Sequence, residues 1–305
     1  MFPSLQFVLW SPANMDPTRP LHINMADQPD PPRVSIIMAC RDSARYLGTA
    51  IESLLADAPH DSEVIILDDG STDDTPHILK QAADRDSRIT LLRNEQPQGV
   101  AVGRNRCARA ASGKYLVQMD ADDVVIPGRI RAQVQFLDAH PDVGVLGGAI
   151  ELIDARGRKF RTRSYPAHDS QIRAIMYRVS PFAQPAVTMR RELFLQAGGY
   201  EPSYLFAQDL DLWLRLAKVT RFANLMQPVL QYRVHGRSTT ARFIRRIQLR
   251  SARLRLKAMV NHGHRPSLVD LVFIFGTVAA TILPLPAVLR VFEWIRDKLI
   301  SPLKT

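Results

Sequence analysis

The sequence predicts an α/β fold in which a mostly parallel sheet is flanked by helices. Between residues 33 and 123, four short apolar runs with the character of buried strands alternate with segments of helical periodicity. Strands that alternate with helices of about ten residues are typical of βαβ units, whose strands pair in parallel. The composition agrees, because 46% of the 305 residues are apolar and 23% are charged. This balance excludes wholesale disorder and a multi-pass membrane protein.

Local patterns place each element along the chain. The first helix is expected where four apolar residues keep a period of 3.6, namely Leu47, Ile51, Leu54 and Leu55. The second begins near Thr75, with a proline in its first turn. The first half has strands expected at 34–38, 63–67, 89–92 and 114–119, and helices at 47–55, 75–83 and 102–111. The second half alternates less regularly, with helices expected at 129–139 and 208–217 and strands at 143–153 and 229–233.

Acidic residues follow three of the four strands of the first half within a few positions. Asp42 comes after the first strand, Asp68 and Asp69 end the second, and Asp120 directly follows the fourth. In open α/β sheets, ligands bind beyond the carboxyl ends of the strands. We therefore expect the functional site at this edge of the sheet.

The segment Asp120-Ala121-Asp122-Asp123 is the strongest of these signals. Three carboxylates within four residues repel one another unless a cation lies among them. Oxygen ligands of this kind favour Mg²⁺ or Mn²⁺, ions that commonly bridge to substrate phosphates. The alternative is an acidic loop that caps the next helix. An EF-hand is excluded because its glycine and distal glutamate are missing, and Cys40 and Cys107 lie in no cluster that would indicate structural zinc.

A second polar segment, Asp68-Asp69-Gly70-Ser71, ends the neighbouring strand. A turn with a helix N-cap explains part of it. A cap needs only one acceptor, however, and a carboxylate at a strand end can also accept hydrogen bonds from a base or a ribose. No GxGxxG pattern follows the first strand, where Ala39-Cys40-Arg41-Asp42 stands instead, and this disfavours a dinucleotide-dependent dehydrogenase.

These segments belong to a longer series of motifs in a fixed order between residues 33 and 240. The series consists of Val34 to Ile51, Asp68-Asp69-Gly70-Ser71, Gly99 to Asn105, Asp120 to Asp123, Gly198-Gly199-Tyr200, Ala207 to Trp213 and Tyr232-Arg233-Val234-His235. As an ordered set it resembles the family-2 glycosyltransferases with the GT-A fold, and the set is far more specific than any single motif. The resemblance implies a Rossmann-like, GT-A-type sheet with a nucleotide-sugar half at 33–123 and an acceptor half at 124–240.

The resemblance also implies which residues bind the donor. Ala39, Arg41 and Asp69 would contact the nucleoside of a UDP-linked or similar nucleotide-linked sugar, with Arg104 nearby. Ala39 stands where the family frequently has proline, so the nucleotide preference is the least constrained part of this expectation.

A metal site is implied in the same way. Asp120 and Asp122 would form the family's DxD pair, in which Asp122 holds Mg²⁺ or Mn²⁺ and Asp123 assists. His235 matches a late polar position that helps hold the diphosphate or the metal. The alternative for His235 is a surface histidine at the end of a strand.

The catalytic base implied by the resemblance is Asp209. It matches the aspartate of the family's Glu-Asp motif, although Gln208 stands in place of the glutamate. Asp209 would take the proton from an acceptor hydroxyl, and the sugar would be transferred with inversion. The alternatives are a helix N-cap at Asp209 and, for the whole chain, a non-catalytic scaffold that keeps the fold.

The C-terminal third concentrates the positive charge. The net charge is +10, and the stretch between Asp211 and Asp270 holds 13 Lys or Arg with no acidic residue, which leaves 10 − 13 = −3 for the rest. Residues 241–259 are expected to form a basic amphipathic helix. Residues 268–289 carry one charge and are long enough to reach across a bilayer, but two prolines interrupt them.

A membrane surface explains both the basic helix and the apolar run after it. A nucleic-acid partner would explain the arginines alone and would leave the acidic cluster without a role, so none is expected. A solvated charged face is the remaining alternative for the arginines. We therefore expect peripheral or single-pass attachment through residues 241–305.

Three regions are expected in total. Residues 1–32 read as a disordered, proline-rich leader, residues 33–240 as the glycosyltransferase domain, and residues 241–305 as the tail. The two cysteines cannot form a disulfide framework and indicate a reducing, cytoplasmic compartment. The expected partners are a nucleotide-sugar donor, a saccharide or lipid-linked acceptor and the inner face of the cell membrane, as in the assembly of surface polysaccharide or glycolipid.

Overall fold

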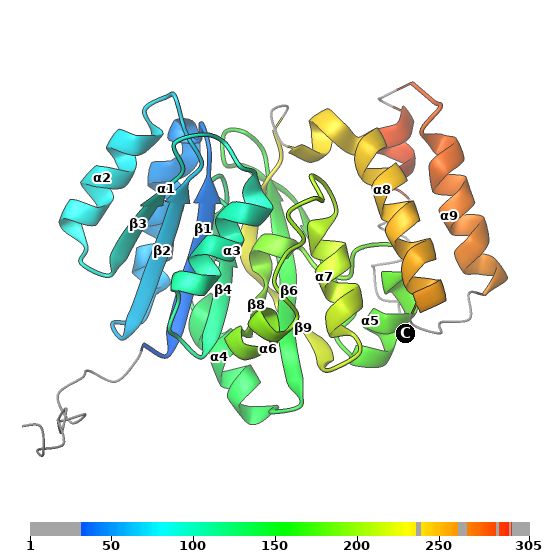
Figure 1. The fold of residues 1–305 in the computed structure, drawn as a ribbon, viewed down its shortest axis with the longest axis horizontal. Helices are drawn as coiled ribbons and strands as arrows, with labels where there is room; N and C mark the ends of the chain where they lie inside the picture. The colour runs from blue at the N-terminus through cyan, green and yellow to red at the C-terminus, as the bar shows by residue number, and fades with distance from the viewer. Residues whose placement is uncertain (1–31, 236–238, 262–266, 285–286, 293, 295–305) are drawn as a thin grey trace, which may run out of the picture. The chain divides into compact units, whose positions relative to one another are not determined.

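A computed structural model describes residues 32–235, 239–261, 267–284, 287–292 and 294. The expected leader therefore lies outside the described residues, except for Pro32. Among the described residues, nine strands form one sheet that is flanked by helices (Figure 1). The predicted α/β class is confirmed.

The first half of the chain forms a parallel sheet with strand order β3-β2-β1-β4. The elements are β1 (Val34–Cys40), α1 (Ala44–Asp57), β2 (Ser62–Asp68), α2 (Thr75–Arg85), β3 (Ile89–Arg93), α3 (Val100–Ala110) and β4 (Tyr115–Met119). All of the strands and helices predicted here are confirmed, with Pro76 in the first turn of α2. In the register of the two parallel strands, Cys40 lies opposite Asp68, so β1 and β2 end at the same level of the sheet.

The second half is a mixed sheet, because β8 pairs antiparallel with both β4 and β6, whereas β9 pairs parallel with β6. The longer elements are α4 (Arg129–Ala139), β6 (Val143–Ile153), α7 (Gln208–Leu216) and β9 (Arg221–Arg233). They confirm the predictions, although β9 begins at Arg221 and not at Val229. The short elements were not predicted, since few residues carry too little periodicity: β5 (Val124–Val125), β7 (Lys159–Arg163), α5 (Asp169–Met176), η3 (Gln184–Ala186), β8 (Thr188–Arg190) and α6 (Arg191–Gln196).

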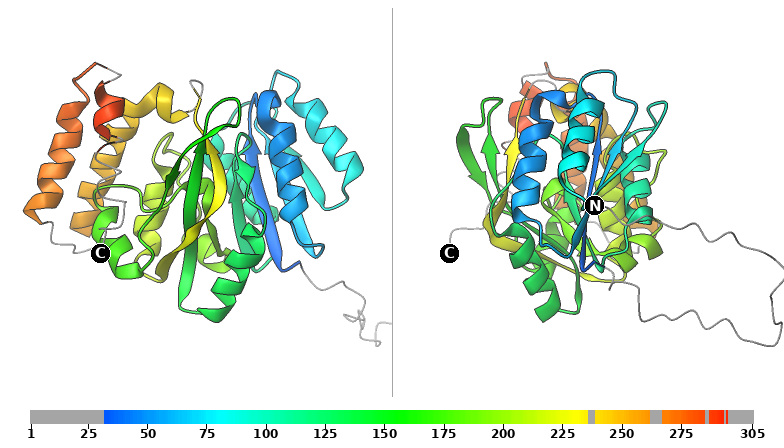
Figure 2. Two further views of the ribbon diagram at one scale, coloured as in Figure 1. Left: turned by 180° about the vertical axis from the view of Figure 1, so that it is seen from behind. Right: turned by 90° about the vertical axis from the view of Figure 1, so that its left-hand side faces the viewer.

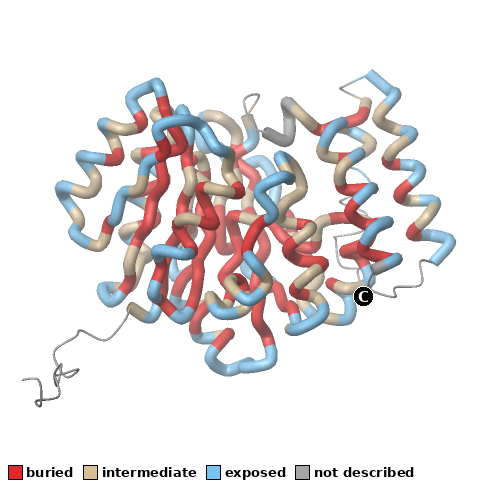
Figure 3. The backbone as a smooth tube through the Cα atoms, in the orientation of Figure 1, coloured by how far each residue is buried: buried red, intermediate tan, exposed pale blue. Residues whose placement is uncertain are grey.

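Helices cover both faces of the sheet, and each face has its own apolar core (Figures 2 and 3). In β1, Val34, Ile36 and Met38 point to the core that includes α1, α2 and α4. Ile37 points to the opposite core, which includes α3, α6 and α7. Because successive side chains of a strand alternate between faces, an almost continuous apolar run is what a strand covered on both sides requires.

The C-terminal region continues this second core. The helix predicted at 241–259 is α8 (Thr239–Asn261), and its residues Ala252, Ala258 and Met259 are buried in the same cluster as Trp213 of α7. The next helix, α9 (Leu268–Ala280), begins with a capping box between Ser267 and Asp270. Among the residues that the structure describes, none of the helices combines the length and apolar character that a bilayer span requires.

Candidate active site

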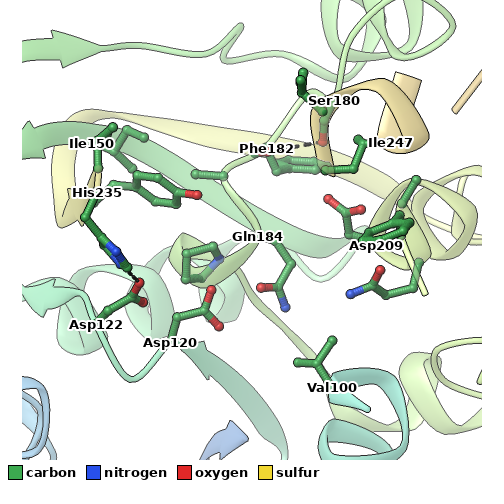
Figure 4. Close-up of a pocket in the computed structure, with 18 of the residues that line it drawn as sticks. Val100, Asp120, Asp122, Ile150, Ser180, Phe182, Gln184, Asp209, His235 and Ile247 are labelled. Carbon is green, nitrogen blue, oxygen red and sulfur yellow. Dashed lines mark hydrogen bonds and ion pairs between the residues drawn. The ribbon is translucent and has the colours of Figure 1, made fainter. Parts of the chain in front are cut away.

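A cavity of about 1000 Å³ lies at the carboxyl ends of β1 and β4. It is lined from the end of β9 and from α3, α7 and α8 as well (Figure 4). Seven of the predicted site residues line it: Ala39, Arg41, Arg104, Asp120, Asp122, Asp209 and His235. The other two, Asp69 and Asp123, are buried and do not line it.

The acidic segment after β4 gathers three carboxylates at one point. Asp120 follows the last residue of β4, Ala121 and Asp122 form a turn, and Asp123 precedes β5. One ligand oxygen from each aspartate lies within 4.8 Å of the others. Burial and the charge of Asp120 raise the pKa of Asp122, and burial with the charges of Asp122 and Asp120 raises the pKa of Asp123 well above its usual range. Carboxylates that repel one another in this way suit a site that shares a cation.

His235 meets this cluster from the end of β9. Its Nε2 atom lies 2.8 Å from Oδ2 of Asp122 (Figure 4). The contact forms because β5, directly after the acidic segment, pairs antiparallel with the last residues of β9. The ring of Tyr46 packs beside the imidazole, with centroids 5.2 Å apart. A carboxylate oxygen and an imidazole nitrogen that line one cavity are both ligands for a divalent metal ion.

Asp123, which directly follows Asp122 in the chain, is 1% exposed. Its Oδ1 accepts a hydrogen bond of 2.8 Å from the backbone N–H of Arg233. Its Oδ2 is buried and has no hydrogen-bond partner among the described residues. Because a buried carboxylate oxygen without a partner is costly, this atom is consistent with a nearby cation. The donor set therefore fits Mg²⁺ or Mn²⁺.

Arg104 of α3 forms an ion pair with Asp120 and fixes its carboxylate at the edge of the cavity. The guanidinium group also lies over the ring of Tyr200, 5.8 Å from its centroid. Helix α3 can approach β1 this closely because Gly103 has no side chain. A Cβ atom at that position would lie 2.9 Å from the Cβ of Ala39.

The neighbouring Asn105 holds the loop that contains Gly198-Gly199-Tyr200. Its Nδ2 donates to the carbonyl oxygen of Tyr200 at 2.7 Å, and its Oδ1 accepts from the N–H of Tyr200 at 2.8 Å. A side chain at Gly199 would collide with Oδ1 of Asn105, since its Cβ would lie 2.5 Å away. The motif that contains Asn105 and the motif Gly198-Gly199-Tyr200 thus hold the ring of Tyr200 against the guanidinium group of Arg104.

Asp69, predicted to contact the nucleoside, uses its carboxylate within the protein. It accepts hydrogen bonds from Nδ2 of Asn94 at 2.6 Å and from the backbone N–H groups of Gln98 and Gly99 at 2.8 Å each. These bonds fix the loop that leads into α3. Contact between Asp69 and a nucleoside stays a prediction, whereas Arg41 lines the cavity and forms an exposed ion pair with Asp42 at 3.5 Å.

Asp209 lies in the first turn of α7, across the cavity from Asp122 (Figure 4). The helix begins directly after Ala207, whose φ of 58° places an alanine in the left-handed region at the edge of the site. Burial raises the pKa of Asp209, while the charges of Arg104 and Arg255 partly oppose this shift. A carboxylate with a raised pKa at the wall of a cavity has the properties of a general base.

Residues 35–197 match the family model described as glycosyl transferase family 2, which covers more than half of the chain. The chain belongs to glycosyltransferase family 2. It is a glycosyltransferase, and the resemblance read from its motifs is confirmed.

Curated relatives agree with this assignment. The glycosyltransferase is 34% identical over 187 residues to the putative glycosyltransferase EpsE of Bacillus subtilis, a match that covers 60% of this chain and 66% of that protein. It is 29% identical over 210 residues to the O-antigen biosynthesis glycosyltransferase WbnJ of Escherichia coli, with 68% of this chain and 81% of that protein covered.

Solved structures of similar fold include two glycosyltransferases. S. aureus TarS in complex with UDP has a TM-score of 0.59 and 20% identity, with 75% of this chain and 66% of that chain covered. The mannosyltransferase PcManGT of Pyrobaculum calidifontis, in complex with GDP-Man and Mn²⁺, has a TM-score of 0.56 and 19% identity, with 88% and 85% covered. At these identities the likeness shows the fold, and the glycosyltransferase has the GT-A fold.

Sequence reasoning missed the contribution of α8 to the site of this glycosyltransferase. Five residues of the helix line the cavity, namely Ile244, Ile247, Gln248, Ser251 and Arg255. The pattern of exposed arginines suggested a separate tail and drew attention away from this inner face. A signal was present, because Gln248, Ser251 and Arg255 follow one another at the helical spacing of three and four on the same face as Ile244.

Proposed function

We propose that this glycosyltransferase transfers a sugar from a UDP-linked donor to an acceptor hydroxyl with inversion at the anomeric carbon. Asp209 is the general base, and the Asp122–His235 pair holds a divalent ion beside the donor diphosphate. The observation that carries the proposal is that Asp209 and the Asp122–His235 pair line one cavity from opposite sides. The cavity of about 1000 Å³ that they line is large enough to hold a sugar between the base and the leaving group.

The reaction needs one proton transfer that this chain performs itself. The acceptor oxygen attacks the anomeric carbon from the face opposite the diphosphate, and Asp209 accepts the hydroxyl proton. The new carbon–oxygen bond forms while the bond to the diphosphate oxygen breaks, and its electron pair leaves with the diphosphate. A positioned base contributes about 10²- to 10⁴-fold to the rate. The raised pKa of Asp209 makes its carboxylate a stronger base than an exposed aspartate.

Mg²⁺ or Mn²⁺, when bound, supplies positive charge that compensates the departing diphosphate. Asp122 and His235 are the residues that would hold the ion, with Asp120 and Asp123 beside them. Arg104 keeps Asp120 in place through their ion pair. The complex of PcManGT with GDP-Man and Mn²⁺, on a similar fold, supports this assignment.

The donor nucleotide is expected to be UDP, held near Ala39, Arg41 and Arg104. TarS, on a similar fold, has been solved with UDP and with UDP-GlcNAc. The acceptor is expected to be a saccharide or a lipid-linked saccharide of a surface polysaccharide or glycolipid. Relatives named for O-antigen, amylovoran and succinoglycan biosynthesis support this class of product.

We infer peripheral attachment to the cytoplasmic face of the membrane from the exposed side of α9. Leu268, Val269, Val272 and Phe275 are between 59% and 77% exposed and recur at helical spacing, whereas Ile274 lies on the packed side. The adjacent helix α8 (Figure 1) exposes basic side chains that anionic headgroups attract: Arg245, Arg246, Arg253 and Lys257. An apolar stripe beside basic residues is typical of a helix that lies in a membrane interface.

A panel of nucleotide sugars tests the proposed reaction. Thermal unfolding of the purified protein is measured with UDP-, GDP- and other nucleotide-linked sugars, with Mn²⁺ and with chelator. A ligand that binds the folded state raises the melting temperature, so UDP-sugars are expected to do so and to need Mn²⁺. Hydrolysis of the stabilising donor then confirms that the bond to the diphosphate is broken. If no nucleotide sugar stabilises the protein or is hydrolysed, the proposal is wrong.

A further inference from the structure

Arg233, the last residue of β9, joins the acidic segment to another part of the sheet. It is 6% exposed and does not line the cavity. Its backbone N–H donates to Oδ1 of Asp123 at 2.8 Å, and its side-chain Nε donates to the carbonyl oxygen of Asp122 at 2.7 Å. Its Nη1 donates to the carbonyl oxygen of Asp154, directly after β6, at 3.2 Å. One residue thus ties the acidic segment to the turn between β6 and β7.

These bonds begin where the pairing of β5 with β9 stops. The ladder between the two strands contains two residue pairs and starts at Val124. Asp122 lies in the turn before β5, where no strand pairing fixes its backbone. Because the rotamers open to a side chain depend on the backbone dihedrals of its own residue, a carboxylate in an unpaired turn needs another restraint. The bond from Nε of Arg233 to the carbonyl oxygen of Asp122 supplies it.

The ring of Tyr46 extends this support to His235. The guanidinium carbon of Arg233 lies 4.5 Å from the centroid of the ring, and the centroid of the imidazole of His235 lies 5.2 Å from the same point. The face of an aromatic ring attracts a cation at such a distance, so the guanidinium holds the ring in place. The held ring in turn limits the positions open to the imidazole packed beside it. Arg233 therefore contacts Asp122 directly and His235 through Tyr46.

We propose that Arg233 is a positioning residue of the metal site. Its guanidinium group holds the carboxylate of Asp122 and the imidazole of His235 in the arrangement that binds Mg²⁺ or Mn²⁺. This inference rests on the proposed function and adds to it a residue that acts only through the proposed ligands. Partners behind metal ligands contribute about 10- to 100-fold to metal affinity, because they fix the orientation of those ligands before the ion arrives.

Binding of Mn²⁺ itself tests this role without turnover. Free Mn²⁺ gives an electron paramagnetic resonance signal that decreases when the ion binds, so the purified protein is titrated with Mn²⁺ in the presence of UDP. Arg233→Met keeps an unbranched side chain and removes its donors. It is expected to weaken the binding of Mn²⁺ by about 10- to 100-fold. The affinity for UDP in chelator, measured by calorimetry, should stay within about twofold of wild type, since Arg233 does not line the cavity.

Arg233→Lys separates the shape of the guanidinium group from its charge, and it retains a donor if the methionine variant does not fold. An ammonium group is a compact charge that cannot reproduce the planar fork with which Arg233 reaches Asp122 and Asp154 together. The lysine variant is therefore expected to lose at least about tenfold in affinity for Mn²⁺. Wild-type affinity in this variant would show that charge alone suffices and would overturn the proposal.

Arg190→Met is the matched control for a role in stability alone. Arg190 also ties together backbone carbonyls, because its Nη2 donates to Leu137 at 2.7 Å and its Nε donates to Val143 at 3.0 Å. It lies opposite Tyr115, the first residue of β4, and so at the other end of this strand from the acidic segment. The control is expected to lower the melting temperature and to bind Mn²⁺ as wild type does.

Two further results would overturn the proposal. One is an affinity for Mn²⁺ that does not change in Arg233→Met. The other is an equal loss of affinity in Arg190→Met, which would mean that the effect comes from general destabilisation. Failure of the proposed function would look different, because the wild-type protein would then bind no Mn²⁺ in the presence of UDP.

Discussion

The Nε2 atom of His235 lies 2.8 Å from Oδ2 of Asp122, although 113 residues separate the two in the chain. The short strand β5 accounts for this proximity. It continues the chain directly after the acidic segment and pairs Val124 with Gln231 and Val125 with Leu230. The end of β9 and the end of β4 are therefore held together before any ligand binds, and such preorganisation is what a metal or diphosphate site needs.

Removal of either member of this pair is expected to abolish the effect of metal on donor binding. In the wild-type protein, Mn²⁺ is expected to raise the affinity for UDP by about tenfold or more. Asp122→Ala and His235→Ala each delete one proposed ligand, so each substitution should remove this gain. Calorimetric titration of UDP with Mn²⁺ and with chelator measures the effect. Asp84→Ala, an exposed position on α2, is the control. A variant that keeps the Mn²⁺-dependent gain would show that its side chain is not a ligand.

Asp209→Asn is expected to lower the rate of transfer by about 10²- to 10⁴-fold, because an amide cannot accept the hydroxyl proton. The affinity for UDP should stay within about twofold of wild type, since Asp209 lies across the cavity from the proposed diphosphate site. Initial rates with a saturating donor and calorimetry measure the two quantities. Asp211→Asn is the control on the same helix, as Asp211 pairs with Arg215 at 2.8 Å and does not line the cavity. Transfer by Asp209→Asn above about a tenth of the wild-type rate would exclude the assigned role.

The same substitution is expected to stabilise the folded protein at neutral pH. Burial raises the pKa of Asp209 above its ordinary value of 3.8, so ionisation of the carboxylate costs more in the folded state than in the unfolded state. The folded state holds its proton to higher pH, and the penalty grows as the pH rises from the unfolded pKa through the folded one. The melting temperature of Asp209→Asn should therefore exceed that of wild type at neutral pH. Each 1 kcal/mol gained in the free energy of unfolding corresponds to a rise of about 2–4 °C. This difference should shrink toward about pH 4. A difference that is constant over this range would mean that the charge of Asp209 is not its cause.

Activity should follow the same titration. Because only the ionised carboxylate of Asp209 accepts a proton, kcat/KM is expected to fall as the pH drops through the raised pKa, above the range of an exposed aspartate. A pH–rate profile at saturating Mn²⁺ shows where this decline begins. An acid limb that lies at or below about pH 4 would argue against a buried base.

Membrane attachment through α9 predicts that charge on its exposed side abolishes binding to lipid. The double substitution Val272→Glu and Phe275→Glu replaces two exposed apolar side chains, 64% and 61% exposed, with carboxylates that anionic headgroups repel. Co-sedimentation with vesicles that contain anionic lipid should fall to the level without vesicles. Val219→Glu, 66% exposed after α7, is the control and should sediment as wild type does. Unchanged sedimentation of the double variant would rule out α9 as the attachment surface.

These substitutions are preferable to deletion of the region after residue 240. Helix α8 contributes Arg255 and Ile247 to the cavity and buries Ala252 and Met259 in the second core. Deletion would remove part of the site and part of the core together with the membrane surface. Loss of sedimentation by such a fragment could then come from unfolding.

The sequence by itself determined the sheet of the first half, the acidic segment at the end of β4 and the position of Asp209 at the start of α7. These features depend on local information, because the period of apolar residues sets strands and helices and a carboxylate after a strand lies at the carboxyl edge of the sheet. The family resemblance added His235 and the ordering of the motifs.

Only the tertiary structure decided which of these side chains share a cavity and what else lines it. It directs the carboxylate of Asp69 toward the loop before α3, brings His235 against Asp122 through the two-residue strand β5, and places Arg255 of α8 in the wall of the cavity that Asp209 also lines. The physical reason is that such contacts depend on how distant elements pack. The exposed arginines of α8 and the buried Arg255 have the same chemistry in the sequence, and only the packing of α8 against α7 distinguishes them.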